Sequence, residues 1–405
     1  MIVLSMKWWA KERELNNIDV AVLGGGTAGS LAAAMLGRMG ISTILVDIHQ
    51  VYPVEFRCEK LDGDQVDLLK KTGLVDAVLA AATPTTEIWV ARRGYVIGKK
   101  QGKHGEPCEY GVAYEDLVNV IRRQIPDSVQ FICAKVTKIT TSSDRQEITL
   151  SNGDTWSTRL IVVATGLNNV VRGAITRSEI SKCHSISVGF DLTSKAGFKF
   201  QALTYSAEKP GPMGYVSLFP IGSRMRANVF VYHGDIRHPW CQEVRTSPLS
   251  ALYSVMPRLK RLLGDAVVSS DIQIRPVDLY AAQNHEQQPG LVLAGDSFAT
   301  SDPAAGTGLN KVLTDVDRLC HHIPTWLATP GMGIEKIQTY YRDPVKVACD
   351  EWSLDEAFYN RSLASDTTLL WRIRRMGWIG LGILDMMGIS IPQLRLMAAS
   401  AVSRG

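Results

Sequence analysis

The feature that most constrains this chain is a run of glycines between an apolar strand and a helix. Ile18–Leu23 is β-branched and apolar, as in a parallel strand buried on both faces, and it leads into GGGTAG at positions 24–29. Thr27–Met39 then predicts a helix rich in Ala and Gly, and Thr43–Val46 predicts a second buried strand. This strand–helix–strand unit predicts an α/β fold with a parallel sheet and a right-handed crossover.

The spacing of the glycines matches a turn that binds a dinucleotide. One glycine permits the tight turn, one lets a pyrophosphate approach the backbone, and one lets the helix pack close to the strand. The helix N-terminus then faces the phosphates, and a carboxylate after the second strand accepts hydrogen bonds from ribose hydroxyls. The alternative is a tight strand–helix turn without a ligand. The residues predicted to hold the dinucleotide are Gly24, Gly26, Thr27, Ala28, Gly29 and Asp47.

A second glycine-containing segment occupies residues 291–319. A buried strand ends at Asp296, a loop passes Pro303, and Gly306 and Gly308 open another helix. The carboxylate at the strand end can accept a hydrogen bond from a polyol. The start of the helix offers free N–H groups and a positive dipole to an electron-rich ring.

Together the two segments resemble the flavoprotein monooxygenases and hydroxylases of the p-hydroxybenzoate hydroxylase fold, over about residues 17–330. The resemblance implies bound FAD, with Asp296 at the ribityl chain and Pro303 near the reactive edge of the flavin. Arg57, in the sequence EFRCEK, resembles an arginine that approaches the cofactor, although a surface arginine is the alternative. The residues that the resemblance adds to the predicted cofactor site are Arg57, Asp296, Pro303, Gly306, Gly308, Leu309 and Asn310.

Two further segments depart from the patterns of related families. Thr165 stands where the monooxygenases usually have an Asp that is tied to the cofactor and to NAD(P)H handling. In Gly214–Pro220, both Trp positions of the flavin-dependent halogenases are replaced, by Tyr215 and Ser217. The same segment resembles geranylgeranyl-reductase relatives except at Ser217. The replacement of both Trp residues counts against halogenation. The resemblance to the reductase relatives keeps a reductase as an alternative.

The fold class predicted for the whole chain is α/β, with a discontinuous Rossmann-like FAD-binding lobe, an inserted antiparallel β-sheet substrate lobe and C-terminal helices. Alternating segments between residues 185 and 278 predict the inserted sheet, interrupted by a helix around Ser250–Leu263. The predicted boundaries are 17–86, 110–180 and 279–330 for the FAD-binding lobe, 87–109 and 181–278 for the substrate lobe, and 331–405 for the C-terminal helical region.

Composition limits the partners. A net charge of +4 argues against nucleic acid, and seven scattered cysteines without a CxxC pair indicate a reducing cytoplasm. No cluster has metal-ligand spacing, so no metal site is predicted. The apolar stretch Met376–Ile391 is too short to span a bilayer and contains Asp385. The C-terminal part resembles the tails of ubiquinone-pathway hydroxylases. It predicts helices that either contact a membrane surface or a partner or, alternatively, pack on the protein itself.

The resemblance implies an FAD-dependent monooxygenase that uses NAD(P)H and O2 to oxygenate an aromatic or apolar small molecule through a flavin C4a-hydroperoxide. Pro303 and Tyr215 are the candidate catalytic residues. The alternatives are an FAD-dependent reductase or dehydrogenase of an isoprenoid-like substrate, a halogenase, and an FAD-binding protein without catalysis.

Overall fold

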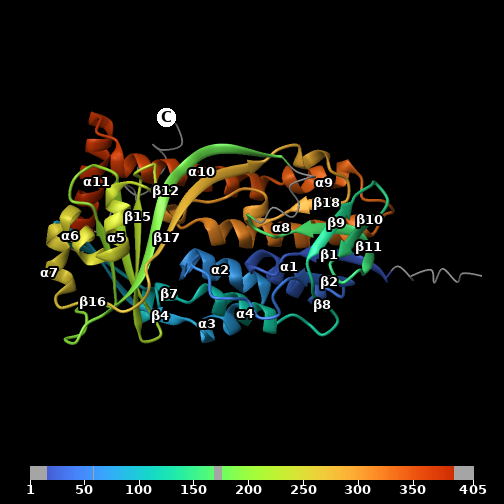
Figure 1. The fold of residues 1–405 in the computed structure, drawn as a ribbon, viewed down its shortest axis with the longest axis horizontal. Coiled ribbons are helices and arrows are strands. Elements are labelled where there is room, and N and C mark those ends of the chain that lie inside the picture. Colours follow the sequence, from blue (N-terminus) through green and yellow to red (C-terminus); the bar gives the residue numbers. More distant parts are fainter. Residues whose placement is uncertain (1–15, 58, 168–175, 387–405) are drawn as a thin grey trace, which may run out of the picture.

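The computed structural model describes residues 16–57, 59–167 and 176–386 of the 405-residue chain. Two large sheets lie toward opposite ends of an elongated molecule, and helices fill the space between and around them (Figure 1). This arrangement confirms the predicted α/β class with a second sheet, which is antiparallel except where residues 202–206 pair in parallel with residues 88–92.

The first sheet is built around β1, whose neighbours are both parallel to it. Val20 and Val22 of β1 are completely buried, as the apolar sequence predicts. Residues 155–163 form one continuous strand, β11. Within the described residues this sheet has seven strands: β8 (Gln130–Cys133), β2 (Thr43–Asp47), β1 (Asn16–Leu23), β11 (Thr155–Val163), β10 (Gln146–Leu150) and β9 (Val136–Thr140), with β18 (Leu291–Leu293) also paired to β11.

Helices from distant parts of the sequence pack on this sheet and on one another. Their apolar residues form one core with β1 and β11, in which Leu31 of α1 and Val316 of α8 are completely buried. The arrangement places the N-termini of α1 and α8 near the carboxyl ends of β1 and β18. The helices are α1 (Thr27–Arg38), α2 (Gly63–Thr72), α3 (Val75–Ala80), α4 (Tyr114–Arg123), α8 (Gly308–Leu327) and α9 (Ile334–Tyr341).

The second sheet has eight strands among the described residues. Two long strands, β12 and β17, pair with each other and extend past residues 181 and 278, where the inserted lobe was predicted to begin and end. Residues 87–101, which were assigned to the substrate lobe, join this sheet as the antiparallel pair β5 and β6. The strands are β16 (Val267–Val268), β12 (Arg177–Thr193), β15 (Arg224–Val231), β14 (Met213–Ile221), β13 (Ala202–Ser206), β5 (Glu87–Arg92), β6 (Tyr95–Gln101) and β17 (Gln273–Ala282).

The helix expected around residues 250–263 is divided into short pieces. Pro257 lacks a backbone N–H and cannot continue α6 (Pro248–Val255), so a short turn separates it from α7 (Lys260–Leu263). α5 (Pro239–Thr246) precedes them and was not predicted. These helices bury their apolar sides against the second sheet.

A small sheet and the last two helices complete the described fold. The small sheet contains β3 (Lys60–Asp62), β7 (Glu109–Gly111) and β4 (Thr83–Thr85). α10 (Pro344–Ser365) packs against α8 and β14, and α11 (Leu369–Met386) packs against β6. Among the described helices, none has the length and apolar character needed to cross a membrane.

Candidate active site

A cavity of about 1160 Å³ is lined by residues of both large sheets. At one end it meets the glycine turn after β1 and the end of β2. At the other it meets the loop after β18, the start of α8 and the strands β12, β14 and β15. Small-molecule pockets are typically about 300–1,000 Å³, so this cavity has room for more than a small substrate.

The three spaced glycines have different surroundings. Gly24 has φ +97°, and a Cβ there would lie 2.6 Å from the carbonyl oxygen of Ala164. A Cβ on Gly29 would lie 1.8 Å from the carbonyl oxygen of Gly24, so this glycine lets α1 pack against the turn. A Cβ on Gly26 would meet nothing closer than the Tyr114 hydroxyl at 3.6 Å. Gly26 therefore leaves open the space that a pyrophosphate needs.

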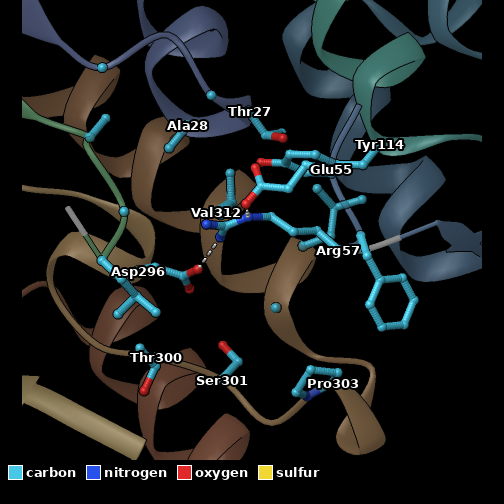
Figure 2. A pocket seen from close by; sticks show the side chains of 18 of the residues that line it. Thr27, Ala28, Glu55, Arg57, Tyr114, Asp296, Thr300, Ser301, Pro303 and Val312 are labelled. Carbon is cyan, nitrogen blue, oxygen red and sulfur yellow. Dashed lines mark hydrogen bonds and ion pairs between the residues drawn. The ribbon is translucent and has the colours of Figure 1, made fainter. Parts of the chain in front are cut away.

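The start of α1 faces this space. Gly26 is the N-cap and has no side chain, so no side-chain oxygen caps the free N–H groups of the first turn. Thr27 and Ala28 line the cavity beside it (Figure 2). Uncapped N–H groups and the positive end of the helix dipole bind phosphate, so the residues present fit a dinucleotide.

Asp47 lines the cavity at the end of β2, as predicted. Its carboxylate accepts hydrogen bonds from the backbone N–H of Gly25 at 2.6 Å and of His49 at 2.8 Å. Arg122 of α4 holds the same turn, because its guanidinium donates to the Gly25 carbonyl at 2.6 and 2.9 Å and lies 3.4 Å from Asp47. Arg122 was not predicted as a site residue, because it lies in no motif and reaches the turn only through the packing of α4.

Arg57 and Asp296 come together at the middle of the cavity. A dashed line in Figure 2 marks their ion pair, which measures 3.0 Å, and Arg57 also contacts Glu55 at 2.9 Å. Glu55 accepts a hydrogen bond from the Tyr52 hydroxyl at 2.6 Å. Burial raises the pKa of Glu55, but the Tyr52 hydroxyl and Arg57 outweigh it and the net shift is downward. Arg57 is thus a cavity residue rather than a free surface arginine.

The loop after β18 reaches α8 through Pro303, whose side chain points into the cavity in Figure 2. The Tyr215 hydroxyl donates a hydrogen bond to the carbonyl of Ala304 at 2.8 Å and so ties β14 to this loop. Burial raises the pKa of Tyr215, which keeps the hydroxyl neutral. Tyr215, the second predicted catalytic residue, therefore lies next to Pro303.

Most of the predicted site residues line this one cavity, but two do not. Gly29 lies behind the turn, and the Asn310 side chain turns away to accept a hydrogen bond from Gln65 at 2.8 Å. Thr165 lines the cavity, and its hydroxyl has no hydrogen-bond partner. Residues 168–175, which follow in the same segment, lie outside the described residues, as does Cys58. The predicted residues that line the cavity are Gly24, Gly26, Thr27, Ala28, Asp47, Arg57, Tyr215, Asp296, Pro303, Gly306, Gly308 and Leu309.

Comparisons with known proteins identify a family for this chain. The family described as FAD binding domain matches residues 17–343. The 3-demethoxyubiquinol 3-hydroxylase of Escherichia coli strain K12 is 24% identical over 319 residues, which cover 74% of this chain and 78% of the relative.

Two solved structures share the fold. The p-nitrophenol 4-monooxygenase PnpA from Pseudomonas putida DLL-E4 is similar with a TM-score of 0.74 at 17% identity, over 95% of this chain and 98% of that chain. The flavin-dependent brominase Bmp2 is similar with a TM-score of 0.67 at 17% identity, over 96% of this chain and 100% of that chain. The chain belongs to the FAD binding domain family and is an FAD-dependent oxidoreductase of the monooxygenase group with the p-hydroxybenzoate hydroxylase fold.

Proposed function

We propose that this enzyme uses NAD(P)H and O2 to add one oxygen atom to an aromatic small molecule. The observation that carries the proposal is the single cavity. It begins at a glycine turn suited to a dinucleotide and continues to a face of the inserted sheet that carries Tyr215 and Phe230, whose ring centroids lie 4.8 Å apart. The names of the hydroxylase relative and of the p-nitrophenol monooxygenase support an aromatic substrate.

The chain's own residues bind and orient the reactants. The turn at Gly26 and the start of α1 would hold the pyrophosphate, Asp47 the adenosine ribose and Asp296 the ribityl chain. Bound FAD would supply the redox chemistry that activates O2. Pro303 and the aromatic face beside it would enclose the reacting end and exclude water, which protects a reactive intermediate from breakdown.

The polar wall of the cavity and the sequence of β14 favour this function over two of the alternatives, the reductase and the halogenase. Ser187, Ser217 and Asn228 line its inner face and provide hydrogen-bonding groups that an isoprenoid chain does not need. The Trp residues typical of the halogenase segment are absent at Tyr215 and Ser217. An aromatic molecule that carries a polar substituent suits this wall best.

The test measures oxygen uptake by the FAD-loaded protein with NADH or NADPH across phenols, quinone precursors and polyenes. Oxygen uptake that the substrate stimulates, with a product heavier by one oxygen atom, supports the proposal. A product that gains two hydrogens without any need for O2 would establish the reductase instead.

We also propose that α11 contacts a membrane surface. Its apolar residues Leu369, Ile373 and Met376 are 73%, 58% and 71% exposed, and Arg372 next to them is exposed as well. Apolar side chains beside a basic one bind the surface of anionic lipid. The protein should sediment with anionic vesicles, and Ile373→Glu should abolish this. Equal sedimentation of the two proteins would contradict the contact.

We further propose that the protein works in a reducing cytoplasm. The cysteines that the structure describes are all free thiols.

A further inference from the structure

The face of the inserted sheet that lines the cavity is aromatic at one end and polar farther along. In β14, Tyr215 and Ser217 point to the same side because side chains alternate along a strand. They pair in register with Phe230 and Asn228 of β15, and Ser187 of β12 pairs with Phe230. All five residues line the cavity. The polar residues Ser187, Ser217 and Asn228 therefore lie next to the aromatic pair beside Pro303.

The segment before β3 covers this face. A Cβ on Gly189 of β12 would lie 2.3 Å from the ring of Phe56, so the glycine leaves the space that the ring occupies. Glu59 follows in the same segment and lines the cavity, and its side chain is only 4% exposed. Its carboxylate lies 3.2 Å from the Arg226 guanidinium and 3.5 Å from the Asn228 side-chain amide.

Burial and the charges around Glu59 together bring its pKa close to neutral pH. Arg226 is shared with a second carboxylate, because its Nε also lies 3.0 Å from Asp191. Burial raises the pKa of Glu59 to about 7, and the negative charges of Asp191 and Glu115 act in the same direction. Arg226 and Asn228 lower the pKa but do not outweigh burial. A carboxylate that titrates near neutral pH is well matched to the work of a general base.

Two buried polar atoms on this cavity wall lack hydrogen-bond partners. They are the side-chain oxygen of Asn228 and the hydroxyl of Ser187. Nearly all buried polar atoms in proteins are hydrogen-bonded, so two such atoms on one cavity wall point to a polar ligand group.

We propose that Glu59, Asn228 and Ser187 bind the hydroxyl group of a phenolic substrate, and that Glu59 accepts its proton. This assignment rests on the proposed function, because it names the substrate class and the base for the same cavity. Glu59 was not predicted as a site residue, since no motif includes it.

The step transfers one proton and no electrons. The O–H bond of the phenol breaks, its electron pair stays on the phenolate oxygen, and a new O–H bond forms on Glu59. Arg226 retains its ion pair with Asp191 and leaves a positive charge close to the new phenolate. The phenolate ring is richer in electrons than the phenol, so it reacts faster with an electrophilic oxygen atom.

The experiment compares two probes on the FAD-loaded enzyme: 4-chlorophenol and its methyl ether 4-chloroanisole, which has no proton to give. The pH is set one unit above the pKa of Glu59, where 4-chlorophenol in solution is still the neutral phenol. Glu59→Gln should weaken 4-chlorophenol binding on the order of 10- to 100-fold, the usual effect of losing a buried hydrogen bond to a charged group. Binding of 4-chloroanisole should change less than about 3-fold. Difference absorbance should show bound phenolate in the wild type and the neutral phenol in the variant.

Glu208→Gln is the matched control. Glu208 is a carboxylate of the same lobe, paired with Arg258 at 3.8 Å, but it does not line the cavity, so the variant should bind both probes as the wild type does. Equal losses in Glu59→Gln and Glu208→Gln would show a merely structural role and overturn the proposal. Ser187→Ala leaves every charge in place and should weaken only 4-chlorophenol, by roughly 3- to 10-fold. This variant keeps the test decisive if Glu59→Gln does not fold.

Oxygen uptake separates this inference from the proposed function. Turnover of a phenol by the wild type should rise as the pH increases through about 7, because Glu59 then becomes the carboxylate that accepts the proton. An unchanged pH profile in Glu59→Gln, with normal oxygen uptake, would overturn the role of Glu59 and leave the monooxygenase standing. The expected binding pattern without any oxygen uptake would support the phenol site and contradict the monooxygenase.

Discussion

The two ends of the cavity differ in whether backbone or side chains form the wall. At the dinucleotide end the wall is largely backbone: a glycine turn, the first turn of α1 and carbonyl groups that Arg122 holds in place. At the substrate end the wall consists of side chains that alternate along β12, β14 and β15. Backbone walls suit the constant shape of a cofactor, whereas exchangeable side chains set which substrate fits.

The largest expected effect comes from filling the backbone wall. Gly29→Ala places a Cβ 1.8 Å from the Gly24 carbonyl oxygen, so the turn or the helix must shift. Overpacking of this kind costs about 1–3 kcal/mol or more, and FAD binding should fall with it. Chemical denaturation and flavin content measure the two effects. Gly63→Ala at the start of α2 is the control, because its Cβ would meet nothing within 4 Å and stability should be maintained.

Loss of a single polar contact at the middle of the cavity should have a smaller effect. Asp296→Ala is expected to weaken FAD binding by about 1–3 kcal/mol, the cost of losing one partner of a buried hydrogen bond. Fluorescence titration of FAD measures the dissociation constant. Arg57 retains Glu55 as an ion-pair partner in this variant, so the fold should persist. An unchanged dissociation constant would remove Asp296 from the cofactor site.

The difference between the two ends also explains what sequence could predict. The glycine turn, the strand before it and the carboxylate of Asp47 lie within one short stretch, where spacing itself carries the geometry. The contact between Arg57 and Asp296 joins residues far apart in the chain, and only the family resemblance suggested that both lie near the cofactor. The hydrophobic pattern likewise predicted the second sheet, although it did not show that β12 and β17 extend past the predicted boundaries of the inserted lobe.

The remaining site residues depend on tertiary packing. Arg122 reaches the glycine turn because α4 packs beside α1, and nothing in its local sequence indicates that contact. Glu59 is placed by a segment that crosses the inserted sheet, at a position where Gly189 makes room for Phe56. Asn310 shows the opposite case: the motif pointed to the cofactor, whereas the side chain contacts Gln65. Its direct contact with FAD stays a prediction.

The smallest expected effect is at the junction of the two ends, where Tyr215 binds the loop that carries Pro303. Tyr215→Phe removes one hydrogen bond to the Ala304 carbonyl and should lower the free energy of unfolding by about 0.5–1.5 kcal/mol. FAD content should be unchanged, because the ring and its packing against Phe230 remain. Burial raises the pKa of Tyr215, so its hydroxyl stays protonated on both sides of neutral pH and the pH profile of phenol turnover should not move. The profile of Glu59→Gln should move, and this contrast assigns the proton transfer. If Tyr215→Phe shifted the pH profile while Glu59→Gln did not, Tyr215 would be the base. The polar side chains of the inserted sheet would then serve only to position the substrate.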